Sequence, residues 1–421
     1  MDIDYVLESR GHFRVDTAAY REPSVFQVEM DRLFHQGWIY LGHESEVEHE
    51  GDFKTTWIGS QPVLLTRDGE GRIRAFLNFC PHRGATVCRE ASGNARAFVC
   101  PYHGWAFKPD GQLLAIPAPE RYPAEFADYD KNLRPIARVD SYRGLVFGSL
   151  AENVGSLADF LGAARHHIDL WHDRGAGGRV RVAAAHRYAF NGNWKFQAEN
   201  TVDGYHPLVV HRSAFEAFRT LDTGFRGTTY VSQKGMGCTR DLPGGHSTLE
   251  AGSPLEGSFM SPEERAQYQE MLVQRFGPER AEAIVSNQHL FIFPNLMLMD
   301  CNIRVVYPIA ADRTEVQSYP VRLEDVPSGV RDGRLRDVQM RLGTAGVVGA
   351  DDIEIFHGLQ AGLRAQAAQY IVLSRGLGME EILPSGGRVG AMSDETPQRA
   401  FWRQWRARTG LFVKSPAEVA P

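Results

Sequence analysis

The spacing of apolar residues changes character along the chain, and the change predicts two kinds of structure. Residues 24–36 place apolar side chains on one face of a helix that ends at Gly37. Residues 53–79 instead form short runs rich in Thr, Val, Ile and Leu, interrupted by the turn sequence Asp-Gly-Glu-Gly at 68–71. This pattern is typical of antiparallel strands joined by hairpins. Because Gly and Pro recur as far as Gly148, we expect a small β domain over 38–153.

The remaining sequence mixes helical and strand-like patterns. The predicted helices lie at 159–172, 194–206, 351–371 and 396–410, with one more starting at Ser261-Pro262-Glu263-Glu264. Strands are predicted at 183–192 and within 289–320. The expected fold class is therefore α+β, with a small antiparallel β domain at 38–153. Residues 1–37 and 154–421 form a larger domain of helices packed on an antiparallel sheet.

Composition narrows the functional classes. The 421 residues are 43% hydrophobic and 23% charged, which is ordinary for a globular enzyme of two domains. A net charge of −6 argues against a nucleic-acid partner. No apolar run approaches the ~18 residues of a membrane span, and the first residues lack the basic and apolar regions of a secretion signal. We therefore expect a cytoplasmic protein.

The cysteines indicate metal binding rather than disulfides. There are five, an odd and small number for this length. Cys80, Cys88 and Cys100 lie close together in the sequence, and two of them are near histidines. This grouping favours a metal centre in a reducing compartment.

Two short motifs in the β domain form the first candidate centre. The sequence CPHRG at 80–84 offers Cys80 and His82, and CPYHGW at 100–105 offers Cys100 and His103. Two thiolates on one iron and two imidazoles on the other match a [2Fe–2S] cluster of moderate potential. A Cys₂His₂ zinc site is the alternative, but zinc modules usually pair like with like. Cys88 is more consistent with a small buried apolar residue than with a ligand.

These motifs resemble the Rieske domain of the Rieske non-haem iron oxygenases, and the resemblance continues along nearly the whole chain. It implies the catalytic (α) subunit of an aromatic-ring-hydroxylating dioxygenase, with one [2Fe–2S] cluster and one mononuclear Fe(II). Length and several segments are similar to the oxygenases of aromatic carboxylates, such as the terephthalate, salicylate, anthranilate and benzoate groups. The segments are GDFKTTWIG, NGNWKFQAENTVDGYH and QRAFWRQW.

The second candidate centre contains His206 and His211, five residues apart. On an unbroken helix their rings would diverge, but Pro207 disfavours α geometry before it and allows them to converge. Two imidazoles, one carboxylate and open positions suit an Fe(II) that binds O₂. The resemblance implies that Asp352 is the carboxylate ligand, with Asp351 as the less favoured candidate.

Two further residues of this segment have roles implied by the resemblance. Asp203 would connect His103 of one subunit to His206 of the next, since a carboxylate can accept hydrogen bonds from both imidazoles. An ordinary helix-surface aspartate is the alternative. Asn200 matches a position near the open side of the iron.

The substrate-binding residues are predicted from charge and from neighbours. Arg304 lies in an apolar strand and Arg399 in the last helix, and a guanidinium can bind a carboxylate at two points. An internal ion pair is the alternative for each. Leu342, Val347 and Val348 flank the Asp352 segment and are expected to line an apolar pocket or to belong to the core.

The resulting hypothesis is O₂-dependent hydroxylation of an aromatic substrate, most simply cis-dihydroxylation of an aromatic carboxylate. No GxGxxG fingerprint occurs, so NADH would act through a separate reductase or ferredoxin. The cross-subunit path implies a homotrimer, with or without a small β subunit (α₃β₃). The alternatives are a Rieske monooxygenase or demethylase with the same iron sites, and a non-catalytic Rieske electron carrier.

Overall fold

The chain folds into two compact units. The computed structural model describes residues 4–177, 179–220, 237–251, 259–343, 346–384 and 386–411. The smaller unit is Phe34–Asp159, and the larger unit contains the described residues before Phe34 and those from Phe160 onward. Helix α3 (Leu157–Leu161) spans the junction between them.

The smaller unit consists of short antiparallel strands. It contains β3 (Ile39–His43), β4 (Asp52–Ile58), β5 (Gln61–Arg67), β6 (Ile73–Leu77), β7 (Ser92–Asn94), β8 (Phe98–Val99), β9 (Ala106–Phe107), β10 (Leu113–Ala115), β11 (Arg138–Tyr142) and β12 (Leu145–Ser149). These strands form three sheets, in the orders β6-β5-β4-β7, β10-β9-β8 and β11-β12-β3. The prediction of an antiparallel β domain is confirmed.

The predicted hairpin at residues 68–71 joins β5 to β6. The Asp68 carboxylate accepts the backbone N–H groups of Glu70 and Arg72, each at 2.9 Å, and so replaces the ladder bonds that the turn interrupts. Gly71 has a φ of 76°, a conformation that glycine adopts without steric cost.

The larger unit is built on one long antiparallel sheet. Within the described residues its order is β13-β20-β19-β18-β17-β16-β15-β23-β22, and β14 pairs with β20. The strands are β13 (Val180–Val182), β14 (His186–Phe190), β15 (Gly237–Leu242), β16 (His246–Ala251), β17 (Asn287–Ile292), β18 (Leu296–Met299), β19 (Asn302–Ala310), β20 (Arg313–Leu323), β22 (Glu381–Ile382) and β23 (Arg388–Ala391). A separate small sheet contains β1 (Val6–Glu8), β2 (Phe13–Asp16) and β21 (Tyr370–Val372).

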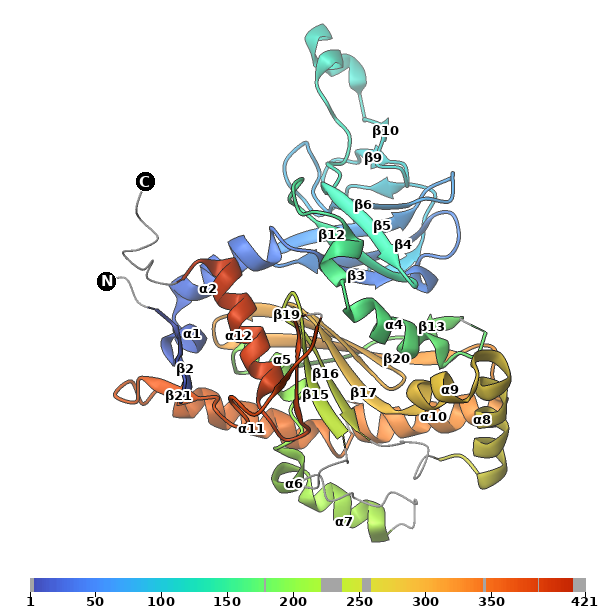
Figure 1. The fold of residues 1–421 in the computed structure, drawn as a ribbon. Coiled ribbons are helices and arrows are strands. Elements are labelled where there is room, and N and C mark those ends of the chain that lie inside the picture. Colours follow the sequence, from blue (N-terminus) through green and yellow to red (C-terminus); the bar gives the residue numbers. More distant parts are fainter. Residues whose placement is uncertain are drawn as a thin grey trace. The chain divides into compact units, whose positions relative to one another are not determined.

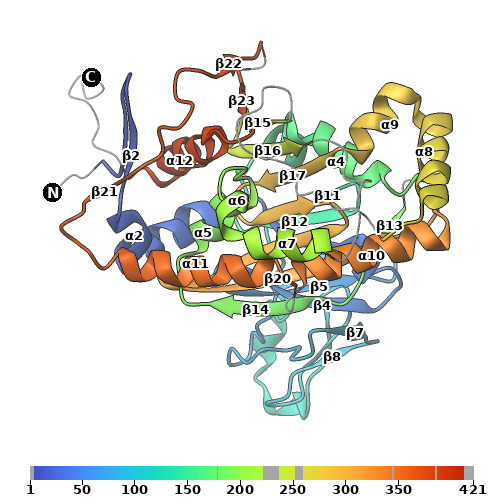
Figure 2. The same ribbon diagram turned by 90° about the horizontal axis from the view of Figure 1, so that it is seen from below.

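Helices pack on this sheet, as the α+β prediction requires. The described helices of this unit are α1 (Ala18–Arg21), α2 (Pro23–Glu29), α4 (Ala164–Asp173), α5 (Trp194–Thr201), α6 (Pro207–Val210), α7 (Arg212–Thr220), α8 (Pro262–Phe276), α9 (Pro278–Val285), α10 (Ser328–Leu342), α11 (Gly349–Gly362) and α12 (Thr396–Thr409), and part of them contact the sheet directly. Helix α12 contacts β15 and β16, α5 contacts β17 and β19, and α10 contacts β20 (Figure 1). Helices α10 and α11 follow one another along the unit, with α6 beside α11 (Figure 2).

The sequence placed most helices correctly and misjudged some of their ends. Ser261 caps α8 through the predicted capping box, and α12 ends before Gly410. The helix predicted at 24–36 is α2 followed by a π-helix, Met30–Phe34. The helix predicted at 351–371 ends at Gly362, because Tyr370–Val372 pairs with β2 instead. In the described part of the chain, no helix is both long and apolar enough to cross a membrane.

Candidate metal centres and substrate cavity

The two Cys-His motifs occupy equivalent loops of the smaller unit. One loop follows β6, and the other joins β8 to β9. In each loop the cysteine carbonyl accepts the N–H of the glycine four residues later, from Gly84 to Cys80 at 2.8 Å and from Gly104 to Cys100 at 3.1 Å. Both glycines have positive φ, 79° and 73°, which a side chain would make costly. The repeated turn presents the cysteine and the histidine of each loop on the same side.

The side chains of these loops converge. The rings of His82 and His103 lie 4.5 Å apart, and His82 stacks on Trp105 at 5.1 Å. The Nδ1 atoms of both histidines are buried and have no hydrogen-bond partner among the described residues. Burial raises the pKa of the Cys80 thiol, and the neighbouring Cys100 raises it further. Two adjacent sulfurs and two unpaired ring nitrogens are the donor set that a [2Fe–2S] cluster of this type requires.

Cys88, the third cysteine of this segment, points elsewhere. Its sulfur contacts the backbone carbonyl of Glu90 at 3.7 Å, and the backbone around it is held by Asn78. The structure thus buries Cys88 in the same apolar cluster as Cys80 and Cys100, with its thiol in contact with a backbone carbonyl.

The second centre depends on a turn that the sequence did not predict. Helix α5 ends at Thr201 and not at residue 206. The Asp203 carboxylate accepts the N–H groups of Tyr205 at 2.6 Å and of His206 at 3.3 Å, which stabilises a turn in place of another helical turn. Pro207 then occupies the first position of α6, where its missing N–H costs nothing. The proline begins a helix here instead of ending one.

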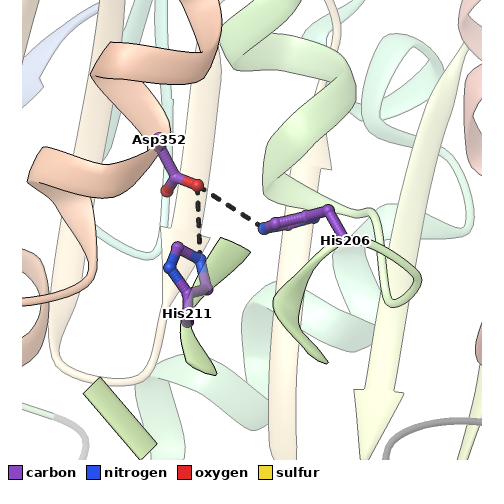
Figure 3. Close-up of side chains that lie close together, drawn as sticks. All are labelled: His206, His211 and Asp352. Atoms are coloured by element: carbon purple, nitrogen blue, oxygen red, sulfur yellow. Dashed lines mark ion pairs between the residues drawn. The ribbon is translucent and has the colours of Figure 1, made fainter. Parts of the chain in front are cut away.

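His206 and His211 therefore flank the short helix α6 and face Asp352 on α11 (Figure 3). The Nε2 atom of His206 lies 3.5 Å from Asp352 Oδ1, and that of His211 lies 3.3 Å from the same oxygen. One donor atom from each of the three residues falls within 4.8 Å of the others. The Asn200 amide donates to Asp352 Oδ1 at 3.1 Å. Two imidazoles and one carboxylate on one side of a site fit the ligand set of a non-haem Fe(II).

A carboxylate also lies at the outer edge of each ring. Asp351 Oδ2 is 3.4 Å from His211 Nδ1, and Asp203 Oδ2 is 3.4 Å from His206 Nδ1. Burial alone would raise the pKa of Asp203, but its contacts with His206 and with nearby backbone N–H groups hold that pKa below its ordinary value. A carboxylate at Nδ1 orients each ring so that Nε2 is available to a metal.

A cavity adjoins this second centre. It is bordered by the three candidate ligands and by Asn200 and Asp203. Arg304, Leu342 and Val348, which the sequence suggested as substrate-binding residues, also line it. Val347 does not line the cavity and is 41% exposed. Ala345, at the start of the predicted segment, lies outside the described residues.

Arg304 lines the cavity from β19, and no described residue forms an ion pair with it. Arg304 is 3% exposed, and its Nε atom has no hydrogen-bond acceptor among the described residues. A buried cation without a partner is costly, so an anionic ligand is expected to complete this position.

The prediction that Arg399 binds substrate is corrected by the structure. Arg399 is fully buried, pairs with Glu380, and donates to the carbonyls of Leu373 at 3.0 Å and Arg375 at 2.8 Å. It does not line the cavity. Its apolar neighbours belong to the buried face of α12, and the internal ion pair was the correct alternative.

Several cavity residues were missed by the sequence analysis. His289 on β17 and Arg341 on α10 both line the cavity, as does Asp300 in the turn between β18 and β19. Arg341 forms ion pairs with Asp300, at 3.2 Å, and with Asp337. Asp337 and Arg341 are four residues apart, a spacing that favours an ion pair on a helix, but the sequence analysis predicted no helix over α10. Nothing in the local sequence marked His289, because its direction is set by strand pairing.

The two centres together define a class of protein, the oxygenases in which an iron–sulfur cluster serves a mononuclear iron. Comparison with known proteins agrees. Residues 37–142 match the Rieske [2Fe–2S] domain family, and residues 178–410 match the catalytic domain of the ring-hydroxylating α subunits. The chain belongs to this ring-hydroxylating α-subunit family. It is a dioxygenase-type oxidoreductase with one Rieske cluster and one mononuclear iron.

Several individual proteins are similar to this chain in sequence or in structure. Toluate 1,2-dioxygenase subunit alpha of Pseudomonas putida is 36% identical over 84% of this chain and 80% of its own length. The anthranilate 1,2-dioxygenase large subunit of Acinetobacter baylyi is 36% identical over 87% and 81%. Among solved structures, naphthalene 1,2-dioxygenase with indole bound superposes with a TM-score of 0.86 at 26% identity, covering 99% and 96% of the two chains.

Proposed function

We propose that this enzyme hydroxylates an aromatic carboxylate, by cis-dihydroxylation with both oxygen atoms taken from O₂. The observation that carries the proposal is Arg304, a buried guanidinium with which no described residue forms an ion pair and which lines the same cavity as the His206, His211 and Asp352 triad. The names of the toluate and anthranilate relatives, each an aromatic acid, support the same substrate class.

In this proposal, the cavity orients the acid by its two ends. The Arg304 guanidinium binds the carboxylate through charge-assisted hydrogen bonds, which are strong in a site with little water. Leu342 and Val348 contact the ring and exclude solvent. Fixing the carboxylate leaves the ring edge toward His206, His211 and Asp352, so binding energy is used to position the reacting carbons.

Each metal centre has a proposed set of protein ligands. Cys80, His82, Cys100 and His103 hold the cluster, and His206, His211 and Asp352 hold the mononuclear iron. When bound, these groups supply one-electron transfer and the activation of O₂. The amide of Asn200 holds Asp352 Oδ1 in place, and Asp203 fixes the ring of His206 while remaining able to accept a hydrogen bond from His103 of a neighbouring copy.

The proposed assembly follows from that last contact. The cluster domain, residues 38–153 of one copy, serves the iron domain of the next copy, formed by 1–37 and 154–421. A closed ring of three copies satisfies every site in this way. A homotrimer is therefore proposed, with or without a small β subunit, acting in the cytoplasm with electrons from a separate reductase or ferredoxin and ultimately from NADH.

Replacing Arg304 tests the substrate class. Arg304→Gln removes the cation and is expected to weaken benzoate binding by roughly 30-fold or more, since a buried charged pair contributes about 2 kcal/mol or above. The dissociation constant is measured by calorimetry on the anaerobic holoenzyme. Arg322→Gln, at an arginine whose side chain is 51% exposed on β20, is the matched control and should bind benzoate like the unaltered enzyme. Equal binding by the Arg304 variant would contradict the proposal.

Isotope labelling tests the reaction type. With ¹⁸O₂, a dihydroxylation places two labelled oxygens in one product, whereas a monooxygenase or demethylase leaves one. A non-catalytic electron carrier would form neither product, and it would keep its redox function after His206→Ala.

A further inference from the structure

His289 and Arg304 both line the cavity, on strands β17 and β19, which are separated by β18. On β17 it pairs with Leu249 of β16 on one side and with Met299 of β18 on the other, and all three residues line the cavity. Met299 pairs in turn with Asn302 of β19, two residues before Arg304. Directly paired residues and residues two apart share a face of a sheet, so His289 and Arg304 project from the same face.

The proton of the His289 ring is located by its hydrogen bond. Nδ1 lies 2.9 Å from the backbone carbonyl oxygen of Thr201. Because a carbonyl oxygen can only accept, Nδ1 must carry the hydrogen. Burial, reinforced by the positive charges of Arg341 and Arg304, lowers the pKa of His289 to about 4. The ring is therefore neutral near pH 7, and Nε2 presents a lone pair.

The Nε2 atom of His289 is an acceptor without a donor. No described residue gives it a hydrogen bond, and it is not among the buried atoms sealed away from solvent. The ring borders the cavity, so Nε2 is reachable from there. Such an acceptor beside a largely apolar site discriminates between ligands that carry a hydrogen-bond donor and ligands that lack one. A ligand that covers the acceptor without donating to it leaves a buried polar atom unsatisfied, which costs binding free energy.

We propose that His289 is a specificity-determining residue whose Nε2 accepts a hydrogen bond from a hydroxyl or amino group on the ring of the substrate. The preferred substrate is then an aromatic acid that carries such a donor in addition to its carboxylate. This inference rests on the proposed function, since Arg304 binds the carboxylate while His289 reads a second substituent. The two side chains are separated by one strand, about 10 Å across the sheet, a span that one substituted ring can bridge.

Matched ligand pairs provide the test. Aminobenzoate and methylbenzoate are nearly equal in size, but only the first donates a hydrogen bond. Dissociation constants are measured on the anaerobic holoenzyme for the 2-, 3- and 4-substituted pairs. In at least one pair the amino compound is expected to bind about 5- to 30-fold more tightly than the methyl compound. The position that shows this preference identifies the substituent that meets His289.

Two variants distinguish recognition from a structural role. In His289→Asn the amide nitrogen takes the place of Nδ1 and keeps the bond to Thr201, but no acceptor remains at Nε2, so the amino preference should fall to about twofold or less. In His289→Gln the amide oxygen lies near the place of Nε2, so part of the preference should remain although the bond to Thr201 is lost. If His289 only held Thr201 in place, the amino preference would survive in His289→Asn, which keeps that bond, and would fall in His289→Gln, which loses it.

The outcomes separate the two proposals. If no pair shows an amino preference, or if His289→Asn keeps the full preference, the role of His289 is overturned while the acid-binding function stands. If Arg304→Gln weakens neither member of a pair, the acid-binding function fails, and the ratio within each pair still reports on His289.

Discussion

Asp351 and Asp352 show how neighbouring residues of one type take different roles. Successive residues on a helix point about 100° apart, and α11 places the two carboxylates on different sides of the His211 ring. Asp352 is 7% exposed and faces Nε2 of both histidines, whereas Asp351 faces only Nδ1 of His211. One position is suited to a metal ligand, and the other to orienting a ligand.

Substitution of each aspartate by asparagine is expected to separate these roles. Asp352→Asn should reduce iron from about three to about two per chain and lower turnover by at least about 100-fold, because the mononuclear iron loses its anionic ligand. Asp351→Asn should retain the iron and lose about 10-fold in turnover, the usual size of an effect on ligand orientation. Iron analysis and product formation measure both. If the Asp352 variant kept its iron and the Asp351 variant lost it, Asp351 would be the metal ligand and Asp352 the orienting carboxylate.

Local spacing predicted those parts of the site that lie close in sequence. His206 and His211 are brought together, as their spacing predicted, whereas Asp352, which joins them, was proposed from the family resemblance and not from spacing. Arg304 and Arg399 looked alike in sequence, but among the described residues only Arg399 has acceptors around its guanidinium, and most of them come from residues 373–380. His289 could not be found, because the face on which a strand residue lies depends on its register with strands elsewhere in the chain.

At the scale of elements, Glu29 joins three helices through one carboxylate. It accepts the indole N–H of Trp194 at 2.8 Å and of Trp405 at 2.6 Å, and it pairs with Lys195 at 2.5 Å. Glu29 and Lys195 are both 0% exposed at their side chains. These contacts connect the last residue of α2 and the middle of α12 to the start of α5, the helix that carries Asn200. Sequence reasoning did not predict these contacts, since Glu29 is more than 160 residues away from each of its three partners.

Removing the Glu29 charge is expected to destabilise the larger unit. Glu29→Gln leaves Lys195 buried without its counter-ion, and breaking a buried pair in this way costs about 3–5 kcal/mol. Thermal unfolding of the holoprotein should show a clearly lower midpoint. The control is Glu216→Gln, which breaks an exposed pair with Arg212 on α7 at 3.7 Å and should cost less than about 0.5 kcal/mol. Equal midpoints for the two variants would mean that the Glu29 network contributes little.

At the scale of the whole molecule, the position of Asp203 bears on how electrons reach the iron. Its side chain remains 31% exposed while contacting the outer edge of His206. The Asp203 carboxylate is therefore open to a group from another copy of the chain. The proposed route, from His103 of one copy through Asp203 to His206 of the next, requires that kind of access.

Mixed oligomers test this route without any structural measurement. His103→Ala removes a cluster ligand and Asp352→Asn an iron ligand, so each variant alone should be inactive. The two are co-expressed with different affinity tags, and oligomers that carry both tags are isolated. A mixed cyclic trimer contains two copies of one variant and one copy of the other. In either case there is one place in the ring where a chain with an intact cluster is followed by a chain with an intact iron site. Turnover should therefore be about one third of the unaltered enzyme's. Separately purified variants that are mixed afterwards are the control for subunit exchange. Inactive mixed oligomers would show that electrons pass within a single chain, since no chain in them has both centres intact.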